Sequence, residues 1–216
     1  MPELTEDLKH ALAPARAALI VIDMQNDFCA PGGYIDRVMG KDVSAAALIC
    51  PALERLIESA RTAGVPVIWI GADYTPDRIP ASMQRKLKAR GITAICCEPG
   101  SWGADWFCVR PGTDEPVIIK HNYSGFAGTQ LGSLLYGLGV TTLVFGGVQT
   151  QVCVESTVRE AHALGYTAVV ARDAVGSHSP KLHEASLMNM EFLFGEVLPV
   201  DDITSVWQPS QGVARQ

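Results

Sequence analysis

Three polar side chains stand at the ends of short apolar runs, where they could act together on a small molecule. Asp23 follows "ALIVI", Lys120 follows "PVII", and Cys153 comes shortly after "LVFGG". A thiol is a nucleophile, a carboxylate can accept its proton and return it to a leaving amine, and an ammonium favours the thiolate. These residue types indicate nucleophilic attack on a carbonyl compound, provided that the fold brings them together.

Each of the three residues also has an ordinary structural explanation. An Asp after a strand commonly makes a turn or caps a helix, a Lys there commonly reaches solvent, and a lone Cys commonly fills a core. The hypothesis therefore depends on their joint placement. In an open parallel sheet, ligands bind outside the carboxyl ends of the strands, and all three residues are predicted at that edge.

Cys153 is predicted at or near the N-terminus of a helix that starts at Val154. Unpaired backbone N–H groups and the helix dipole there favour a thiolate, and the ammonium of Lys120 would lower the pKa of the thiol further. The preceding turn, "GGVQT", would place backbone N–H groups beside the sulfur, where they could stabilise a tetrahedral oxyanion. Asp23 would accept the thiol proton and later return it.

The elements that must position these residues follow from apolar runs and helical spacing. Continuous Val- and Ile-rich runs, typical of strands buried on both faces of a parallel sheet, occur at 17–23, 65–71, 116–120, 141–147 and 167–173. Helices are predicted at 44–63, 129–138, 154–164 and 180–192. Three of them end before a glycine, at Gly64, Gly139 and Gly165. The alternation predicts an α/β fold with a doubly wound, Rossmann-like sheet covered by helices on both faces.

A length of 216 residues suits one domain, 1–216, in which a single segment departs from this alternation. Residues 74–115 are rich in Gly and Pro and contain Trp102 and Trp106, so we expect an irregular excursion with a short helix near 81–90. Long excursions are commonly lids or partner surfaces. The two Trp residues are assigned to such a surface rather than to catalysis, and the termini are expected to be loose.

Composition and charge exclude several partners. Hydrophobic residues make up 48% and charged residues 19%, which is typical of a globular protein. A net charge of -6 without a Lys/Arg stripe argues against a nucleic-acid partner. The basic cluster "RKLKAR" at 85–90 is interpreted as the solvated face of a helix, with a polyanion site as the alternative.

The N-terminal stretch lacks the apolar core of a secretory signal, and no apolar run approaches the ~20 residues of a membrane span. We therefore expect a soluble, cytoplasmic protein with no membrane partner. In that compartment the six cysteines, which form no C-x2-C pair, are interpreted as reduced thiols.

Three stretches that contain the candidate residues resemble the isochorismatase-like cysteine hydrolases. They are "ALIVIDMQNDFCAPGGY", "IIKHNYSGF" and "GGVQTQVCVESTVREAHALGY", in the order and spacing of that family, and the similarity runs from about Ala17 to Val200. The resemblance implies a six-stranded, mostly parallel sheet and a catalytic triad of Asp23, Lys120 and Cys153. It also implies a thioester intermediate, formed when an amide loses ammonia or an amine.

The resemblance implies further details of the site and of the assembly. Members of the family carry a non-proline cis peptide bond four residues before the nucleophile, which here would join Val148 to Gln149. The oxyanion hole would then use the backbone N–H groups of Gln149 and Cys153. A homodimer or homotetramer is also implied.

Branches of the family differ in metal use and in chemistry. The nicotinamidases hold a metal with an Asp and two His near the second strand, whereas "WIGADYTPD" offers Asp73 without a His. Neither a metal nor another cofactor is therefore expected. The branch that hydrolyses the vinyl ether of isochorismate does not use the thiol, and a nucleophilic Cys153 disfavours it.

The motifs are most similar to those of ureidoacrylate amidohydrolases and biuret hydrolases, through "PGGY", "GSW", "YSGF", "CVEST" and "NMEFLFG". The chain departs from them at "GGVQTQV", where ureidoacrylate enzymes usually have Ala and Asn, and in a shorter segment after the second strand. We expect a small-molecule substrate with a ureido or carbamoyl group, such as biuret, triuret or ureidoacrylate. Another small amide, such as maleamate, N-carbamoylsarcosine or a nicotinamide-like compound, is the alternative.

Five residues near the motifs are candidates for contact with substrate. Gln149 offers both donors and an acceptor, which matches a ureido group. Phe28 would wall the site, with a packed core aromatic as the alternative, and Tyr123 could reach substrate or hydrogen-bond backbone. Asn26 and Glu191 complete the set.

Three other functions are compatible with parts of the sequence or with its fold class. Cys153 and Arg159 have the C-x5-R spacing of thiolate phosphatases, but the intervening "VESTV" has no Gly to curl an anion cradle and places Glu155 beside the phosphate. A nicotinamide-dependent oxidoreductase would need a G-x-G-x-x-G after the first strand, where "MQNDF" stands instead. A catalytically silent binding module of the same fold is the non-enzymatic alternative.

Overall fold

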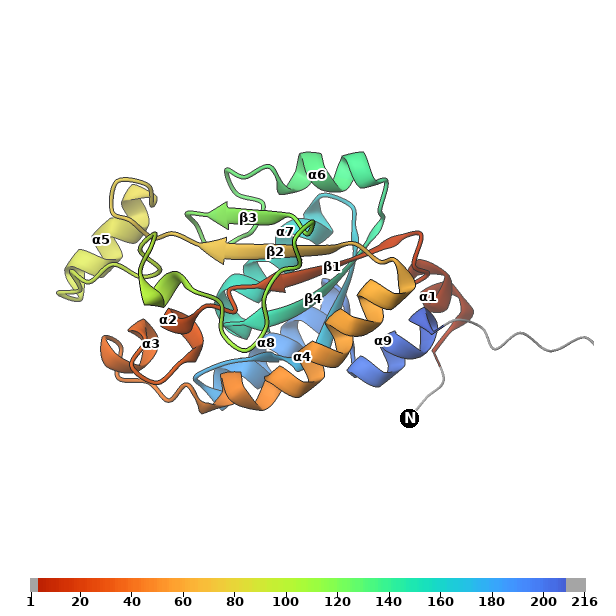
Figure 1. The fold of residues 1–216 in the computed structure, drawn as a ribbon, viewed down its shortest axis with the longest axis horizontal. Coiled ribbons are helices and arrows are strands. Elements are labelled where there is room, and N and C mark those ends of the chain that lie inside the picture. Colours follow the sequence, from red (N-terminus) through yellow and green to blue (C-terminus); the bar gives the residue numbers. More distant parts are fainter. Residues whose placement is uncertain (1–3, 209–216) are drawn as a thin grey trace, which may run out of the picture.

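The computed structural model describes residues 4–208 and has a six-stranded sheet with helices on both faces (Figure 1). Neighbouring strands all pair in parallel, in the order β3-β2-β1-β4-β5-β6. The strands are β1 Ala17–Ile22, β2 Val67–Ala72, β3 Val117–Lys120, β4 Thr142–Val148, β5 Thr167–Gly176 and β6 Glu196–Leu198. The predicted α/β architecture is confirmed, and the sheet is wholly rather than mostly parallel.

Three of the five strands predicted from apolar runs are buried on both sides of the sheet, whereas the edge strand β3 exposes Val117 and Ile119 and so departs from that expectation. Every residue of β1, β2 and β4 is buried. Strand β6 has only three residues, which is too short for a periodic pattern. The sixth strand was implied by the family resemblance alone.

The long helices also lie where the sequence predicts them. They are α4 Ser44–Ala63, α5 Ala81–Ala89, α6 Leu131–Leu138, α7 Glu155–Ala163 and α8 Pro180–Leu193. Gly64 and Gly139 end α4 and α6 in the left-handed conformation, with φ of 73° and 67°, which glycine adopts without steric cost. The remaining α-helices of residues 4–208 are α1 Glu6–Ala11, α2 Asn26–Cys29, α3 Tyr34–Arg37 and α9 Val200–Trp207.

Side chains of β1 alternate between two apolar cores, one on each face of the sheet. Leu19 and Val21 share a core with residues of α4 and α9, whereas Ile20 and Ile22 share one with residues of α6, α7 and α8. This alternation fixes the register of β1, because a shift by one residue would exchange the two faces. Ile22 consequently pairs with Ile70 and with Gly147, so the carboxyl ends of β1, β2 and β4 lie along one edge.

The excursion between β2 and β3 contains α5 and a 3-10 helix at Trp102–Ala104. In Figure 1 α5 and the 3-10 helix lie, with α2 and α3, beyond the arrowheads of β2 and β3, at the edge where the predicted site is placed, and the chain then runs back across the sheet to the start of β3. Gln25 links the excursion to β2 through two hydrogen bonds. Its Nε2 donates to the Ala104 carbonyl at 3.0 Å, and its Oε1 accepts from the Ala72 N–H at 2.7 Å. An irregular segment is thus attached over the carboxyl end of the sheet.

The cysteines differ from the sequence-based expectation, since Cys50 of α4 and Cys108 of the excursion form a disulfide. The two residues are 58 positions apart, and they meet because the excursion passes beside α4. No local pattern encodes that contact. The expectation of reduced thiols is wrong for this pair, whereas Cys29, Cys96, Cys97 and Cys153 are free.

Two expectations concern the ends of the chain and the membrane. The loose termini fall on residues 1–3 and 209–216, outside the described residues. Across residues 4–208, no helix combines the length and the apolar character that crossing a bilayer requires.

Candidate active site

The sheet brings the three strand-end residues into direct contact. Nζ of Lys120 lies 2.9 Å from Oδ2 of Asp23 and 3.4 Å from Sγ of Cys153. Asp23 and Lys120 are fully buried, and Cys153 is 4% exposed. A carboxylate, an ammonium and a thiol therefore share one desolvated space at the carboxyl edge of the sheet.

Asp23 takes an unusual backbone conformation just after β1. Its φ is 52°, in the left-handed region that non-glycine residues rarely occupy, although Asp is among those that tolerate it. The backbone N–H of Asp23 still donates to the Ile70 carbonyl at 2.8 Å, as if the sheet continued. The residue thus turns its carboxylate out of the strand while its backbone remains anchored to β2.

The chain approaches Cys153 through a close contact between β4 and β1. At Gly147 φ is 112°, and a Cβ there would lie 2.0 Å from the carbonyl oxygen of Ile22, so only glycine fits. The cis peptide bond between Val148 and Gln149, implied by the resemblance, is present. A π-helical turn, Thr150–Val154, then carries Cys153 directly before α7.

Burial has the largest effect on the pKa of each of the three residues. Burial and the nearby Asp23 raise the pKa of the Cys153 thiol to about 12, while Lys120 acts in the opposite direction. Burial alone would lower the pKa of Lys120, but Asp23 and Cys153 outweigh it and raise that pKa. The pKa of the thiol is thus raised in this site, whereas the helix terminus and Lys120 were expected to lower it.

Asp23 has the properties of a general base. Burial raises the pKa of its carboxyl group, although the charge of Lys120 offsets part of the effect. Within residues 4–208, neither carboxylate oxygen accepts a well-directed hydrogen bond, and the 2.9 Å contact with Lys120 is an ion pair. A buried carboxylate whose pKa is raised, next to a thiol, can accept a proton.

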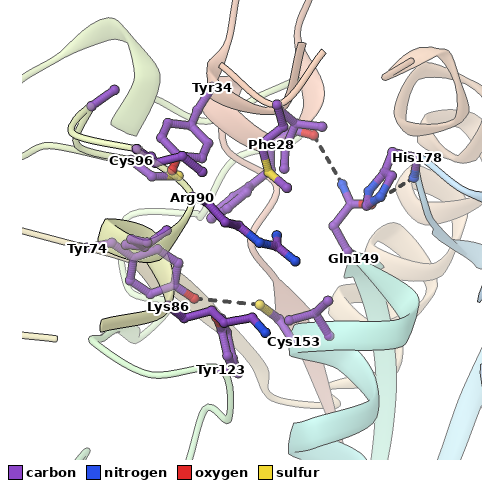
Figure 2. Close-up of a pocket in the computed structure, with 16 residues that line it drawn as sticks. Phe28, Tyr34, Tyr74, Lys86, Arg90, Cys96, Tyr123, Gln149, Cys153 and His178 are labelled. Atoms are coloured by element: carbon purple, nitrogen blue, oxygen red, sulfur yellow. Dashed lines mark hydrogen bonds between the residues drawn. The ribbon is translucent and has the colours of Figure 1, made fainter. Parts of the chain in front are cut away.

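Tyr74 belongs to this cluster, although the sequence analysis did not select it. Its hydroxyl accepts a hydrogen bond from Lys120 Nζ at 2.7 Å and lies 3.7 Å from Sγ of Cys153 (Figure 2). Lys120 also donates to the carbonyl of Asn122 at 3.1 Å. The strand-end rule that selected Asp23 also applies to Tyr74, which follows β2 by two residues.

A cavity of about 220 Å³ opens above Cys153, so the proposed nucleophile lines it. Sites for drug-sized ligands are commonly about 300 to 1,000 Å³, so this cavity suits a smaller molecule. Its walls are largely apolar and come from the segment after β1 and from the excursion, at Phe28, Tyr34, Ile35, Met39, Leu87 and Ile92. The excursion therefore forms part of the cavity wall.

Three of the predicted contact residues line the cavity: Phe28, Tyr123 and Gln149. The side chain of Gln149 is engaged within the protein, because its Nε2 donates to the Phe28 carbonyl at 3.2 Å and its Oε1 accepts from the His178 N–H at 2.8 Å. Gln149 thus joins two walls of the pocket (Figure 2). His178 also lines the cavity and was not selected from the sequence, although it follows the end of β5.

Two other predicted contact residues lie elsewhere. Asn26 is buried, does not line the cavity, and donates from its Nδ2 to the Trp102 carbonyl at 2.9 Å, so it holds the excursion in place. Glu191 is exposed on α8, 3.9 Å from Arg172. The motif around Asn26 does lie at the cavity, because Phe28 lines it, whereas no residue of α8 does, so the segment chosen for Glu191 is wrong.

Within the excursion, the structure differs from two predictions, one for the pair of Trp residues and one for the "RKLKAR" cluster. Trp106 packs edge-on against Trp69 at 5.2 Å and is partly buried, while Trp102 is 54% exposed. Only Trp102 therefore retains the surface role expected for both. In the "RKLKAR" cluster, Lys86 and Arg90 line the cavity, so that face of α5 is not simply solvated.

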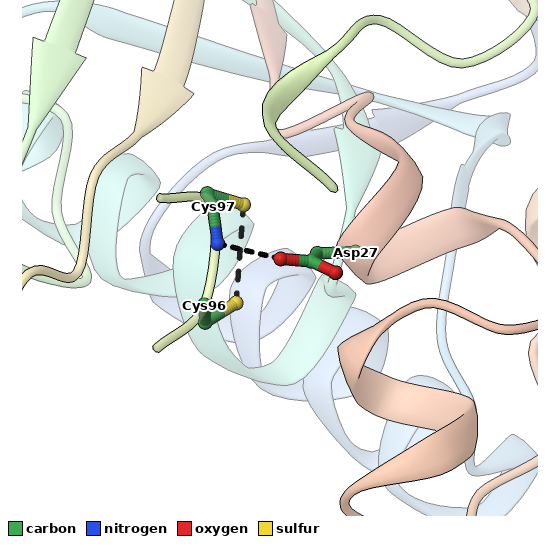
Figure 3. Close-up of side chains that lie close together, drawn as sticks. All are labelled: Asp27, Cys96 and Cys97. Carbon is green, nitrogen blue, oxygen red and sulfur yellow. Dashed lines mark hydrogen bonds between the residues drawn. The ribbon is translucent and has the colours of Figure 1, made fainter. Parts of the chain in front are cut away.

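Residues that could hold a metal are found away from the triad. Asp27, Cys96 and Cys97 place one oxygen and two sulfurs within 4.8 Å of one another (Figure 3). Asp27 already accepts hydrogen bonds from the backbone N–H groups of Tyr34 and Cys97, and burial raises the pKa of both thiols. Protonated thiols are poor metal ligands, so existing contacts account for this cluster.

Asp73, the residue expected at the metal site of nicotinamidases, is also engaged. Its Oδ2 lies 3.1 Å from Arg78, and its Oδ1 accepts from the Thr75 N–H at 3.0 Å. His121 contacts the backbone carbonyl of Asp73 at 2.7 Å. The segment "WIGADYTPD" contains no His, but the fold brings His121 to Asp73 from the end of β3.

Arg159 is not placed to bind a phosphate at Cys153, as a thiolate phosphatase would require. Arg159 donates to Glu155 at 2.8 Å and lies over the ring of Phe194, 4.1 Å from its centroid. It does not line the cavity at Cys153. No anion cradle is therefore formed between Cys153 and Arg159.

Comparison with known proteins gives a family and several relatives. The model of the isochorismatase domain matches residues 17–202. A ureidoacrylate amidohydrolase of Methylobacterium radiotolerans is 40% identical over 209 residues, covering 88% of this chain and 79% of that protein. The enzyme of the same name from Yersinia enterocolitica is 36% identical over 214 residues, covering 93% of each.

Solved structures agree with this match. A cysteine hydrolase from Pseudomonas syringae pv. phaseolicola has a TM-score of 0.81 at 25% identity, covering 96% of this chain and 97% of that one. The N-carbamoylsarcosine amidase from Thermoplasma acidophilum has a TM-score of 0.70 at 26% identity, covering 86% and 97% respectively.

Proposed function

This chain belongs to the isochorismatase family, and from that premise and the geometry of its site we propose that it is a cysteine amidohydrolase of small ureido or carbamoyl amides. The observation that carries the proposal is the contact of Lys120 Nζ with both Asp23, at 2.9 Å, and Cys153, at 3.4 Å, of which Cys153 lines a small cavity. Tyr74 and Asn122 complete the surroundings of the ammonium.

The first half of the reaction cleaves the C–N bond. Sγ of Cys153 attacks the amide carbon while its proton passes to Asp23, and a tetrahedral oxyanion forms. Backbone N–H groups of Gln149 and Cys153 are assigned to that oxyanion. When the intermediate collapses, the C–N bond breaks, Asp23 returns the proton to the nitrogen, and ammonia or an amine leaves a thioester on Cys153.

The second half hydrolyses the thioester. Water attacks the thioester carbon and gives a proton to Asp23, and the C–S bond then breaks. The sulfur recovers its proton from Asp23, and the acid product leaves. Before the reaction Lys120 is an ammonium, because Asp23 and Cys153 raise its pKa despite burial.

The substrate class is supported by the names of relatives and by the size of the cavity. Two relatives are named ureidoacrylate amidohydrolases and one structural neighbour N-carbamoylsarcosine amidase. Ureidoacrylate and N-carbamoylsarcosine both contain a carbamoyl group bound to nitrogen, and biuret and triuret contain the same group. Maleamate and nicotinamide-like amides are the alternative substrates of the same chemistry.

The test is ammonia release from a panel of ureido, carbamoyl and simple amide compounds, with Cys153→Ala as the matched variant. We expect release by the wild type, none by the variant, and an acyl adduct on Cys153 in the intact mass. A chain that binds these compounds without adduct or ammonia would instead be the silent binding module.

We also propose that the protein is a cytoplasmic homodimer or homotetramer. Large apolar side chains are exposed on α8, where Met188, Phe192 and Leu193 are 70%, 77% and 65% exposed, and such a patch is typical of an interface. Sedimentation equilibrium tests the assembly, and a monomer at micromolar concentration would contradict it.

A further inference from the structure

The mouth of the cavity carries two cations that the proposed chemistry does not use. Lys86 lies in the last turn of α5 and Arg90 at its C-cap, and both are exposed and line the cavity. Four residues apart, they lie on the same side of the helix. Figure 2 shows both side chains pointing from α5 into the pocket, toward the side formed by Gln149 and Cys153.

These cations have no acidic partner within residues 4–208. Neither Lys86 nor Arg90 takes part in any of the ion pairs there. The lining of the cavity contains no Asp or Glu, and neither does α5. Like charges four apart on a helix repel each other. The mouth is thus positively charged in a chain whose net charge is -6.

A structural explanation for basic residues at this place does exist. Cations in the last turn of a helix interact favourably with its dipole, and Lys88 does so from outside this cavity. The dipole does not require side chains that point into the pocket. Arg90 also acts within the site, because its charge lowers the pKa of Tyr123 against the larger effect of burial, which raises it.

We infer that Lys86 and Arg90 form a carboxylate subsite, so that the preferred substrate is a short ureido or carbamoyl carboxylate, its acid group lying away from the scissile bond. The inference rests on the proposed amidohydrolase function. Guanidinium and ammonium groups bind carboxylates through charge-assisted hydrogen bonds. A neutral compound such as biuret would leave both cations unpaired, and a cavity of about 220 Å³ limits the chain between the two ends.

One test reads the subsite without any turnover. Iodoacetate and iodoacetamide differ only in carboxylate against carboxamide, and both alkylate Cys153, which peptide mass spectrometry identifies. We expect the ratio of their rates at Cys153 to fall roughly tenfold in Arg90→Gln and in Lys86→Gln. Arg85→Gln, which removes a charge from the same helix outside the cavity, is the matched control and should leave the ratio unchanged.

A second test uses turnover of 3-ureidopropionate and its methyl ester. We expect kcat/KM of the wild type to favour the acid, and Arg90→Gln to lower it roughly 10- to 100-fold for the acid alone. Equal rates for acid and ester in the wild type, with an alkylation ratio that Lys86 and Arg90 do not affect, would overturn the subsite and leave the amidohydrolase intact. If the alkylation ratio depends on Lys86 and Arg90 but no ammonia is released, the subsite is supported and the proposed amidohydrolase function is wrong.

Discussion

Asp23, Lys120 and Cys153 change one another's ionisation because they share one buried space. Burial raises the pKa of the thiol, Asp23 raises it further, and Lys120 lowers it. The two charged residues therefore act on the thiol in opposite directions, although the proposed reaction needs both. Thiol reactivity and turnover can be measured separately, so the assignments can be tested one residue at a time.

For Asp23→Asn, we expect turnover to fall while the thiol becomes more reactive. Loss of the general base should lower kcat/KM by about 10²- to 10⁴-fold. Loss of the neighbouring negative charge should lower the pKa of Cys153, so iodoacetamide should alkylate it faster at pH 8. Alkylation slower than in the wild type, in a variant with unchanged circular dichroism, would contradict the role given to Asp23.

The same role predicts the acid side of the pH profile. Asp23 must be unprotonated to accept the thiol proton, and burial raises its pKa above the ordinary value of about 4. Activity of the wild type should therefore decline, as pH falls, through a pKa higher than 4. Full kcat/KM maintained down to pH 4 would show that another group accepts the proton.

Lys120→Met should have the opposite effect on the thiol. Without the ammonium, the pKa of Cys153 rises and alkylation slows. The variant also leaves Asp23 buried without a counter-ion, which costs about 3–5 kcal/mol in comparable pairs, so urea denaturation should show a lower free energy of unfolding. Lys88→Met, at an exposed position of α5, is the control and should change neither quantity.

Tyr74→Phe removes a single hydroxyl from the cluster. That group accepts from Lys120 at 2.7 Å and lies 3.7 Å from Cys153, whose pKa it helps to lower. Hydrogen bonds to charged groups contribute about 1.5–3 kcal/mol, so kcat should fall about 10- to 100-fold. The chain should still fold, and a kcat equal to that of the wild type would remove Tyr74 from the mechanism.

At the scale of elements, the site depends on how closely β4 approaches β1. Gly147 lies where a Cβ would overlap the Ile22 carbonyl oxygen, and the turn that carries Cys153 begins just beyond it. A displacement of β4 would move the sulfur relative to Asp23, which follows Ile22 directly. Sheet packing and nucleophile position are therefore coupled at this one residue.

Gly147→Ala and Gly128→Ala form a matched pair, since φ is positive at both positions, 112° and 71°. A Cβ at Gly128 meets nothing within 4 Å, so only backbone strain of about 1–2 kcal/mol applies. At Gly147 the overlap adds to the strain, and we expect destabilisation beyond about 3 kcal/mol in urea unfolding. Equal losses in the two variants would show that the β4–β1 contact tolerates a side chain.

At the scale of the molecule, the Cys50–Cys108 disulfide joins α4 to the excursion that forms the pocket. Closing a loop of 58 residues contributes up to about 4 kcal/mol by restricting the unfolded chain. Thiol titration of the denatured, unreduced protein should count four free cysteines, and Cys50→Ser should lower the melting temperature. A count of six, with no effect of Cys50→Ser, would restore the reduced cytoplasmic form expected from the sequence.

Local chemistry in the sequence determined much of this protein. The apolar runs that became five strands and the spacing that became α4 and α8 are properties of short segments, because strand burial and helix amphipathicity repeat over a few residues. The glycine stops after α4 and α6 are local for the same reason. The strand-end positions of Asp23 and Lys120 followed from the strands, since carboxyl ends of parallel strands share an edge.

Only the tertiary structure decided what depends on distant segments meeting. Tyr74 contacts Lys120 and Cys153, and Asn26 turns away from the pocket, because side-chain direction is set by packing rather than by distance along the chain, whereas Glu191 lies on a helix that does not reach the pocket. The pKa of the Cys153 thiol is raised because burial, a property of the whole fold, outweighs the charge of Lys120. The Cys50–Cys108 bond and the inward direction of Lys86 and Arg90 likewise arise where the excursion folds back over the sheet, and no periodicity in the sequence records that path.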